Sequence, residues 1–251
     1  MNCERMIQIG LFVVLWSVSG CGPATQERQQ KANLQYEVGV AELNSGRYAE
    51  ALKALQAAVK YNPDDPRIHN ALGLIYFQQR RYDEAIKSFE KALAIDPTFL
   101  DARNHVGYVY ANLKQWDRAI KEFSAIVNDP LYRTPELGYY NLGLALMETN
   151  DLIGAVQAFH KAVQLQPNFT RAFDKYGLSL FRMNRIQEAI KQFQRVIELD
   201  PDYIEAYLNL GIAYMTQDKR QDAVTQFKIV LERSTDTALT AEAQRYLEFL
   251  Q

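Results

Sequence analysis

The sequence has 251 residues, of which 48% are hydrophobic and 23% are charged, and its formal net charge at pH 7 is -2. This composition is typical of a folded chain, and so small a net charge excludes the strong basic excess that a nucleic-acid-binding surface needs. Both cysteines, Cys3 and Cys21, lie near the N-terminus, so we expect no disulfide framework and no cysteine zinc site in the rest of the chain.

The N-terminal segment 1–20 has the features of a secretion signal. Met6 to Trp16 is a mostly apolar run, too short for the roughly 20 residues of a membrane-spanning helix. Val18 to Cys21 then gives a branched apolar residue, two small residues and a cysteine, which resembles a bacterial lipobox. That resemblance implies removal of residues 1–20 and attachment of acyl chains such as palmitate to Cys21, and more than one chain anchors a protein stably in a membrane. The alternative is a general secretory signal in which Cys21 has no role.

The residues after the cysteine bear on the destination of such a lipoprotein. Lipoproteins held in the inner membrane often carry Asp after the cysteine, whereas this chain has Gly22. The resemblance therefore implies sorting to the outer membrane. Gly22 to Lys31 is mostly polar, so residues 21–31 are predicted to be a lipidated cysteine followed by a short tether.

From residue 32 onward the sequence repeats with a period of 34 residues, interrupted once by a step of 36. One glycine marks each repeat, at Gly39, Gly73, Gly107, Gly143, Gly177 and Gly211. An alanine follows twelve residues later, at Ala51, Ala85, Ala119, Ala155, Ala189 and Ala223. A large apolar residue follows four residues after that, at Leu55, Phe89, Phe123, Phe159, Phe193 and Phe227. Proline closes four of the repeats, at Pro63, Pro97, Pro167 and Pro201.

This pattern resembles the tetratricopeptide repeat, a pair of antiparallel helices. The glycine and alanine allow close helix approach, the aromatic fills the gap to the next unit, and proline ends the second helix. The predicted fold is an all-α solenoid of six helix-turn-helix units with a C-terminal capping helix. The predicted boundaries are 32–65, 66–99, 100–135, 136–169, 170–203 and 204–237 for the units within 32–237, and 238–251 for the capping helix.

The sequence offers no candidate catalytic residues. His69, His105 and His160 occupy different repeat positions, so they are not expected to converge on a metal ion. There is no H-E-x-x-H, G-x-S-x-G or phosphate-binding loop. We therefore expect a protein that is not an enzyme, without cofactor, metal, nucleic acid or small-molecule substrate.

The resemblance implies a binding groove on the concave side of the stack, lined by the first helix of each unit. The predicted groove residues are Asn70, Leu74, Phe77, Asn104, His105, Tyr108, Tyr140, Asn141, Leu144, Arg171, Lys175, Leu178, Phe181, Arg182, Leu208, Asn209 and Ile212. A side-chain amide both donates and accepts, so the recurring asparagines could bind the backbone of an extended peptide, with apolar pockets beside them. The alternative is that asparagine merely suits a hydrated helix face.

One group within the groove resembles part of a carboxylate clamp. Asn141, Arg171 and Lys175 occupy three of the five places that such tetratricopeptide clamps use to bind a peptide carboxylate, but the third unit lacks the expected lysine and asparagine. The alternative is that both basic residues are ordinary solvated side chains neutralised by Asp174.

The 36-residue step points to one particular family among the tetratricopeptide-repeat proteins. Two extra residues lie within Asn128 to Glu136 (NDPLYRTPE), after the third of six units. Together with the lipobox, this insertion resembles the type IV pilus biogenesis and stability lipoproteins, the pilotins of the pilus secretin. The resemblance implies an outer-membrane lipoprotein that faces the periplasm and assists secretin localisation and assembly, with the secretin as its protein partner. A tetratricopeptide scaffold that recruits envelope peptidases or cell-wall enzymes stays open as the alternative.

Overall fold

The computed structural model describes residues 23–250, and in this part of the chain helices joined by turns and short loops are the regular secondary structure, without strands. The predicted leader and Cys21 lie outside the described residues. The helices are α1 (Pro23–Asn44), α2 (Tyr48–Tyr61), α3 (Pro66–Gln78), α4 (Tyr82–Ile95), α5 (Leu100–Asn112), α6 (Trp116–Ile126), α7 (Pro135–Glu148), α8 (Leu152–Leu165), α9 (Thr170–Arg182), α10 (Ile186–Leu199), α11 (Ile204–Thr216), α12 (Arg220–Arg233) and α13 (Thr237–Phe249).

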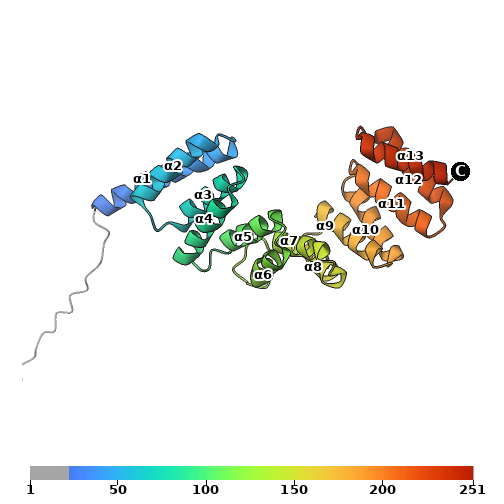
Figure 1. Ribbon diagram of the computed structural model, residues 1–251, viewed down its shortest axis with the longest axis horizontal. Coiled ribbons are helices and arrows are strands. Elements are labelled where there is room, and N and C mark those ends of the chain that lie inside the picture. Colours follow the sequence, from blue (N-terminus) through green and yellow to red (C-terminus); the bar gives the residue numbers. More distant parts are fainter. Residues whose placement is uncertain (1–22, 251) are drawn as a thin grey trace, which may run out of the picture.

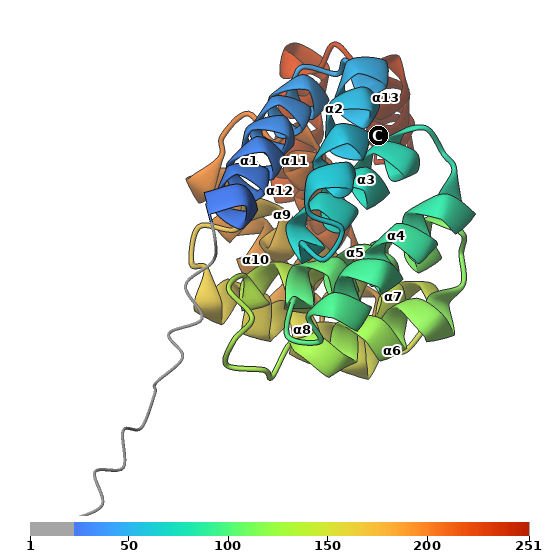
Figure 2. The same ribbon diagram turned by 90° about the vertical axis from the view of Figure 1, so that its left-hand side faces the viewer.

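Consecutive helices form six antiparallel pairs that stack into an arch (Figure 1). The first helices of neighbouring pairs contact one another, as α5 contacts α7, whereas within residues 23–250 no two second helices do. The first helices therefore line the concave side, and Figure 1 shows α5 and α7 above α6 and α8 on the inside of the arch. Viewed from its end, the stack winds as a superhelix (Figure 2). The predicted all-α tetratricopeptide-type solenoid of six units with a C-terminal helix is confirmed.

The repeated glycines bring the two helices of a unit into contact. A Cβ placed on any of the five glycines from Gly73 to Gly211 in the repeat series would lie 2.5 to 2.7 Å from a ring atom of the phenylalanine in the same unit. The five rings are at most 1% exposed. Each ring also faces the next unit, as Phe89 packs with Ala102 and Val106 of α5. One side chain thus joins three helices, which fixes the spacing of the solenoid.

The turn inside each unit uses a left-handed residue. The positions with positive φ are Gly46, Arg80, Lys114, Asn150, Asn184 and Asp218. In the second unit the backbone N–H of Arg80 donates to the Phe77 carbonyl at 2.9 Å and that of Arg81 to the Tyr76 carbonyl at 2.8 Å. These bonds satisfy carbonyls at the end of the first helix and reverse the chain into the second.

The predicted tether is wrong from Pro23 onward, because residues 23–31 form the beginning of α1. Proline is well tolerated at the first position of a helix, and the following Ala, Gln, Glu, Arg and Lys residues have high helix propensity. Lys31 pairs with Glu27 one turn earlier at 2.6 Å. The polar composition that suggests a linker therefore belongs to an exposed helix.

The insertion between the third and fourth units is packed onto the core. Tyr132 is 4% exposed and contacts Leu100, Ile126 and Val127. Its neighbour Leu131 is 63% exposed. Within the insertion, the Tyr132 side chain is therefore buried in the core and the neighbouring Leu131 side chain faces solvent.

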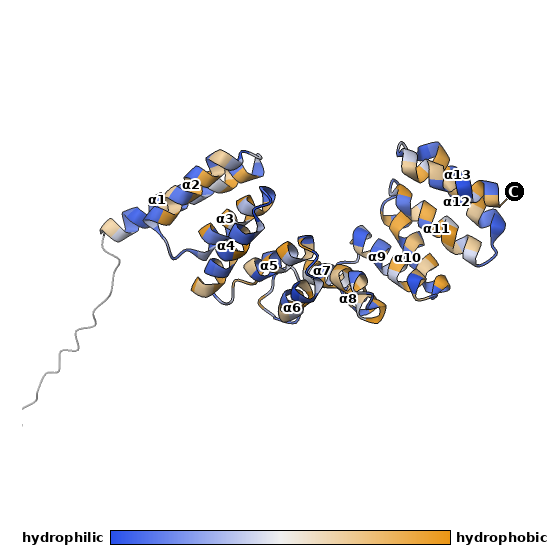
Figure 3. Cartoon of the chain, in the orientation of Figure 1, coloured by the Kyte–Doolittle hydropathy of each residue, from blue (hydrophilic) through white to orange (hydrophobic). Residues whose placement is uncertain are grey.

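Helix α13 closes the C-terminal end of the stack. The Asp236 carboxylate accepts a hydrogen bond from the Ala238 backbone N–H at 2.7 Å and caps the helix. Tyr246 stacks on Phe227 with ring centroids 5.2 Å apart, and Ala243 is fully buried beside them. In Figure 3 α13, like the other helices, carries both polar and apolar residues, as expected for a helix with one buried face.

Candidate peptide-binding groove

Partly buried polar side chains connect successive first helices along the concave face. Each of these hydrogen bonds joins two neighbouring units at equivalent positions. One partner lies three residues before the repeat glycine of its unit, and the other lies two residues before the repeat glycine of the following unit. These bonds, called rungs below, join Asn70 Oδ1 to His105 Nδ1 at 2.8 Å, Asn141 Nδ2 to Asn104 Oδ1 at 3.2 Å, and Asn209 Nδ2 to Asp174 Oδ1 at 3.1 Å.

The rungs determine how the predicted asparagines are presented. Each asparagine uses one group of its amide to bond the neighbouring helix, and an amide has both donor and acceptor groups. Asn104 therefore keeps its Nδ2 and Asn141 its Oδ1 for a ligand. Because the rungs hold these side chains, the remaining groups point in fixed directions, which lowers the entropy lost on binding.

His105 lies between two units rather than free in the groove. Its ring centroid is 5.1 Å from that of Phe89, and its Nδ1–H donates to the Asn70 amide oxygen. Burial lowers the pKa of His105 below the ordinary value of 6.5 because the surroundings disfavour the charged ring. The side chain is therefore a neutral link between α3 and α5 at pH 7.

Asp174 is the most buried charged group of the groove, at 2% exposed. Its carboxylate accepts from Lys175 Nζ at 2.9 Å, from Asn209 at 3.1 Å and from the Tyr203 hydroxyl at 3.4 Å. Burial and the nearby carboxylate raise the pKa of Tyr203, so its hydroxyl stays protonated as a donor. The structure thus pairs Lys175 with Asp174, while the carboxylate clamp itself stays a prediction.

Arg171, the other basic residue of the predicted clamp, lies over aromatic rings. Its guanidinium carbon is 5.8 Å from the centroid of Tyr140 and 5.9 Å from that of Phe169, and the two rings are 5.0 Å apart. This arrangement is a cation–π contact on the concave side, with the side chain still exposed. Arg171 therefore remains an accessible cation, whereas Lys175 is paired.

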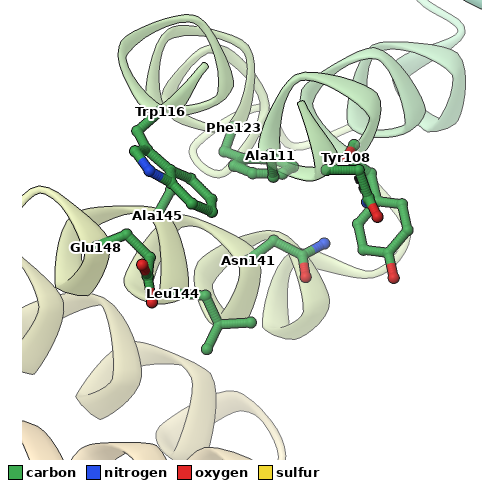
Figure 4. Close-up of a pocket in the computed structure, with 9 residues that line it drawn as sticks. Tyr108, Ala111, Trp116, Phe123, Asn141, Leu144, Ala145 and Glu148 are labelled. Atoms are coloured by element: carbon green, nitrogen blue, oxygen red, sulfur yellow. Dashed lines mark hydrogen bonds between the residues drawn. The ribbon is translucent and has the colours of Figure 1, made fainter. Parts of the chain in front are cut away.

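A pocket of about 260 Å³ opens on the concave side between α5, α6 and α7 (Figure 4). It brings together the predicted residues Tyr108, Asn141 and Leu144 with residues that the predicted site omits. The full lining is Tyr108, Ala111, Asn112, Trp116, Phe123, Asn141, Leu144, Ala145 and Glu148. In Figure 4 Trp116 and Glu148 lie at one end, Tyr108 lies at the other, and Asn141 and Leu144 lie between them.

The remaining predicted residues differ in accessibility. The Phe77 ring packs against Tyr108 with centroids 5.3 Å apart. Leu208 is 5% exposed because α13 and α12 pack around it, so its place in the predicted groove is corrected to the core. Arg182 is exposed at the end of α9. The other predicted apolar residues, Leu74, Leu178, Phe181 and Ile212, are partly buried.

Trp116 is the functional candidate that the sequence reasoning missed. It is the first residue of α6, so a prediction restricted to first helices does not include it. A signal was present, since Tyr48 and Tyr82 occupy the same repeat position. Within residues 23–250 no three His, Cys, Asp or Glu side chains are close enough to hold a metal ion. None of the helices described there combines the length and the apolar character needed to cross a bilayer.

The families that match this sequence agree with its 34-residue period. Tetratricopeptide-repeat sequence models match residues 36–98, 76–130, 136–169, 177–218 and 205–237. The chain is a tetratricopeptide-repeat protein. A comparison with curated protein sequences gave no significant match.

Solved structures with the same architecture include two pilus proteins. Pseudomonas aeruginosa PilF superposes with a TM-score of 0.77 at 18% identity, over 89% of this chain and 99% of PilF. PilW, a type IV pilus biogenesis factor, gives 0.75 at 19% identity, over 87% of this chain and 99% of PilW. YrrB, described as having an unusual peptide-binding site, gives 0.65 at 23% identity, over 77% and 99%. At these identities the likeness is one of fold.

Proposed function

We propose that this tetratricopeptide protein is anchored by lipid at Cys21 in the outer membrane, faces the periplasm, and assists the assembly of the type IV pilus secretin. The observation that carries the proposal is the match in extent with PilF and PilW, which this chain covers almost from end to end. The lipobox and the insertion after the third unit add independent support. Many solved chains share the repeat fold, so the agreement in length matters more than the fold alone.

The groove supplies the means of holding a partner. The free amide groups of Asn104 and Asn141 can form hydrogen bonds with the backbone of an extended segment. The pocket between α5, α6 and α7, called the central pocket from here on, can receive one side chain of that segment. A lipid anchor would hold that segment at the membrane surface and raise the local concentration of bound subunits there. Assembly is thereby favoured without any chemical step.

A deletion strain tests the proposal. We expect loss of the heat- and detergent-resistant secretin multimers while secretin monomers persist, measured by immunoblotting of membrane fractions. Normal multimers in that strain would contradict the proposal and favour a scaffold for envelope peptidases or cell-wall enzymes.

The anchor is tested separately with Cys21→Ser. This variant should leave the outer-membrane fraction and support fewer multimers, because Cys21 is the expected site of acylation. Cys3→Ser is the matched control, since Cys3 lies in the predicted leader, and it should behave like the unchanged protein. A Cys21→Ser protein that still floats with outer membranes and supports full assembly would rule out the lipid anchor.

A further inference from the structure

The central pocket combines an aromatic ring, a carboxylate and apolar walls. We propose that it binds one basic side chain, arginine in preference to lysine, of an extended protein segment lying in the groove. This inference rests on the proposed function only in taking the ligand to be a protein segment. The size, charge and position of the pocket support it independently.

The size of the pocket fits one long side chain. Its volume of about 260 Å³ is below the roughly 300 to 1,000 Å³ of sites that hold a whole small ligand. Ala111, Phe123, Leu144 and Ala145 give it apolar walls. Arginine and lysine carry apolar stems that pack along such walls while the charged head reaches a polar end.

The charge at that polar end is negative. Glu148 is the one charged residue among the nine that line the pocket, and it forms no ion pair with another described residue. It is also the last residue of α7, and Asn112 in the same lining is the last residue of α5. Helix C-termini carry partial negative charge, so two helix ends and a carboxylate favour a cation here.

Two basic residues close to Trp116 in the sequence lie outside the pocket. Lys114 and Arg118 line a separate hollow that shares Trp116 with this pocket. Arg118 donates to the Gln115 side chain at 3.0 Å and lies over the Tyr110 ring at 5.5 Å. The carboxylate at the pocket is therefore left for a cation from outside the chain.

Trp116 selects the kind of cation. In Figure 4 its ring and the Glu148 carboxylate lie at the same end of the pocket. Tryptophan gives the strongest cation–π contacts among the aromatic residues, and a planar guanidinium can stack on the ring while it donates to a carboxylate. A compact ammonium makes only one of these contacts well, which favours arginine over lysine.

The combination occurs at one junction between units. Trp116 is the first residue of the second helix in its unit, and Glu148 lies five residues after the repeat glycine of the next unit. The same two repeat positions can be compared at the other junctions. Along the chain these pairs are Tyr48 with Gln78, Tyr82 with Asn112, Trp116 with Glu148, Leu152 with Arg182, and Ile186 with Thr216. An aromatic ring meets an acid only between the third and fourth units, so the periodic fold alone does not produce this pocket.

The test uses Trp116 as its own reporter. The sequence has two tryptophans and 15 tyrosines, so Trp16→Phe in the full chain leaves the pocket ring as the sole tryptophan, which is excited selectively at wavelengths where tyrosine does not absorb. The probe is an acetylated, amidated Gly-Ser heptapeptide with one central arginine, and the control peptide carries citrulline, which keeps the shape without the charge. We expect a saturable fluorescence change with the arginine peptide and about tenfold weaker binding of the citrulline peptide.

Two variants assign the discrimination to the pocket. Glu148→Gln should make the two peptides bind equally, whereas Asp117→Asn, which removes a charge beside Trp116 but outside the pocket, should preserve the preference. Equal binding of both peptides to the unchanged pocket, a preference that survives Glu148→Gln, or no fluorescence change up to about 10 mM peptide would overturn the inference.

The inference and the proposed function fail in different ways. If deletion of the chain leaves secretin multimers intact while the arginine peptide binds as expected, the pocket stands and the pilus assignment falls. If deletion abolishes multimers but the peptides bind equally, the assignment stands and the basic-side-chain pocket falls.

Discussion

Replacing Asp174 by asparagine should destabilise the C-terminal half of the solenoid. The carboxylate is 2% exposed and accepts hydrogen bonds from Lys175, Asn209 and Tyr203. Asp174→Asn keeps the size of the side chain but removes the charge and one of the two accepting oxygens. At least one of the three donors would then face an amide NH₂ instead of an acceptor.

The magnitude follows from these contacts. Hydrogen bonds to charged groups contribute about 1.5 to 3 kcal/mol, compared with about 1 kcal/mol for neutral ones. Lys175, with 32% of its side chain exposed, can recover part of its hydration, and removal of a buried charge lowers the desolvation cost. We therefore expect a net loss of about 2 kcal/mol in the free energy of unfolding, or about 4 to 8 °C in Tm for a chain of this size.

Urea unfolding followed by far-UV circular dichroism measures the loss, and amide hydrogen exchange locates it. In a solenoid each unit contacts its neighbours only, so exchange should increase in α9 to α11 more than in α3 and α4. Asp202→Asn is the matched control, because this carboxylate is 91% exposed, pairs with Arg233 at the surface and should contribute little. If Asp174→Asn costs no more than Asp202→Asn, the argument for a buried polar link between the last two units is refuted.

Two further predictions concern His105 and the repeat glycines. Burial lowers the folded-state pKa of His105 below 6.5, so the unfolded chain binds a proton more readily than the folded chain. The contribution of neutral, buried His105 to the free energy of unfolding is therefore fully present above about pH 6.5 and is lost as the pH falls toward the folded-state pKa. His105→Gln should flatten that acid loss in urea unfolding at pH 7.5 and 5, and an unchanged pH dependence would contradict it. Gly177→Ala puts a Cβ 2.6 Å from the Phe193 ring and should cost about 1 to 3 kcal/mol despite better helix propensity. Gly154→Ala puts a Cβ against the flexible side chain of the helix cap, Asp151, and should cost less. Urea unfolding measures both losses, and equal losses would refute the packing argument.

The sequence predicts most of the fold because one interaction is repeated. Each repeat glycine is small so that a large apolar side chain, Leu55 in the first unit and phenylalanine in the other five, can lie against it, and that pair follows directly from the period. The turns are harder to predict, since Arg80 and Lys114 adopt positive φ without glycine. Their conformation is imposed by the two helices that they join, at a cost of about 1 to 2 kcal/mol for each residue. Polar composition also misled the prediction at residues 23–31, where exposed helix and tether have the same residues.

The groove is predicted less completely than the fold. Repeat position identifies the concave face, and from it come Tyr108, Asn141 and Leu144 of the central pocket. Repeat position alone does not show that Trp116 reaches that face from a second helix. It also does not show that Leu208 is buried, because this depends on how the last helices pack around one position.

The rungs give the concave face two roles that an experiment must separate. Asn104 and Asn141 bond each other across α5 and α7, so changing either one perturbs both the unit interface and the groups that face a ligand. Lost binding in such a variant would not distinguish a missing contact from altered curvature. Glu148, by contrast, is exposed and forms no ion pair among residues 23–250, so a change there acts on recognition with little effect on packing. In a solenoid whose inner face also holds its units together, the residues best suited to test binding are those outside the rungs.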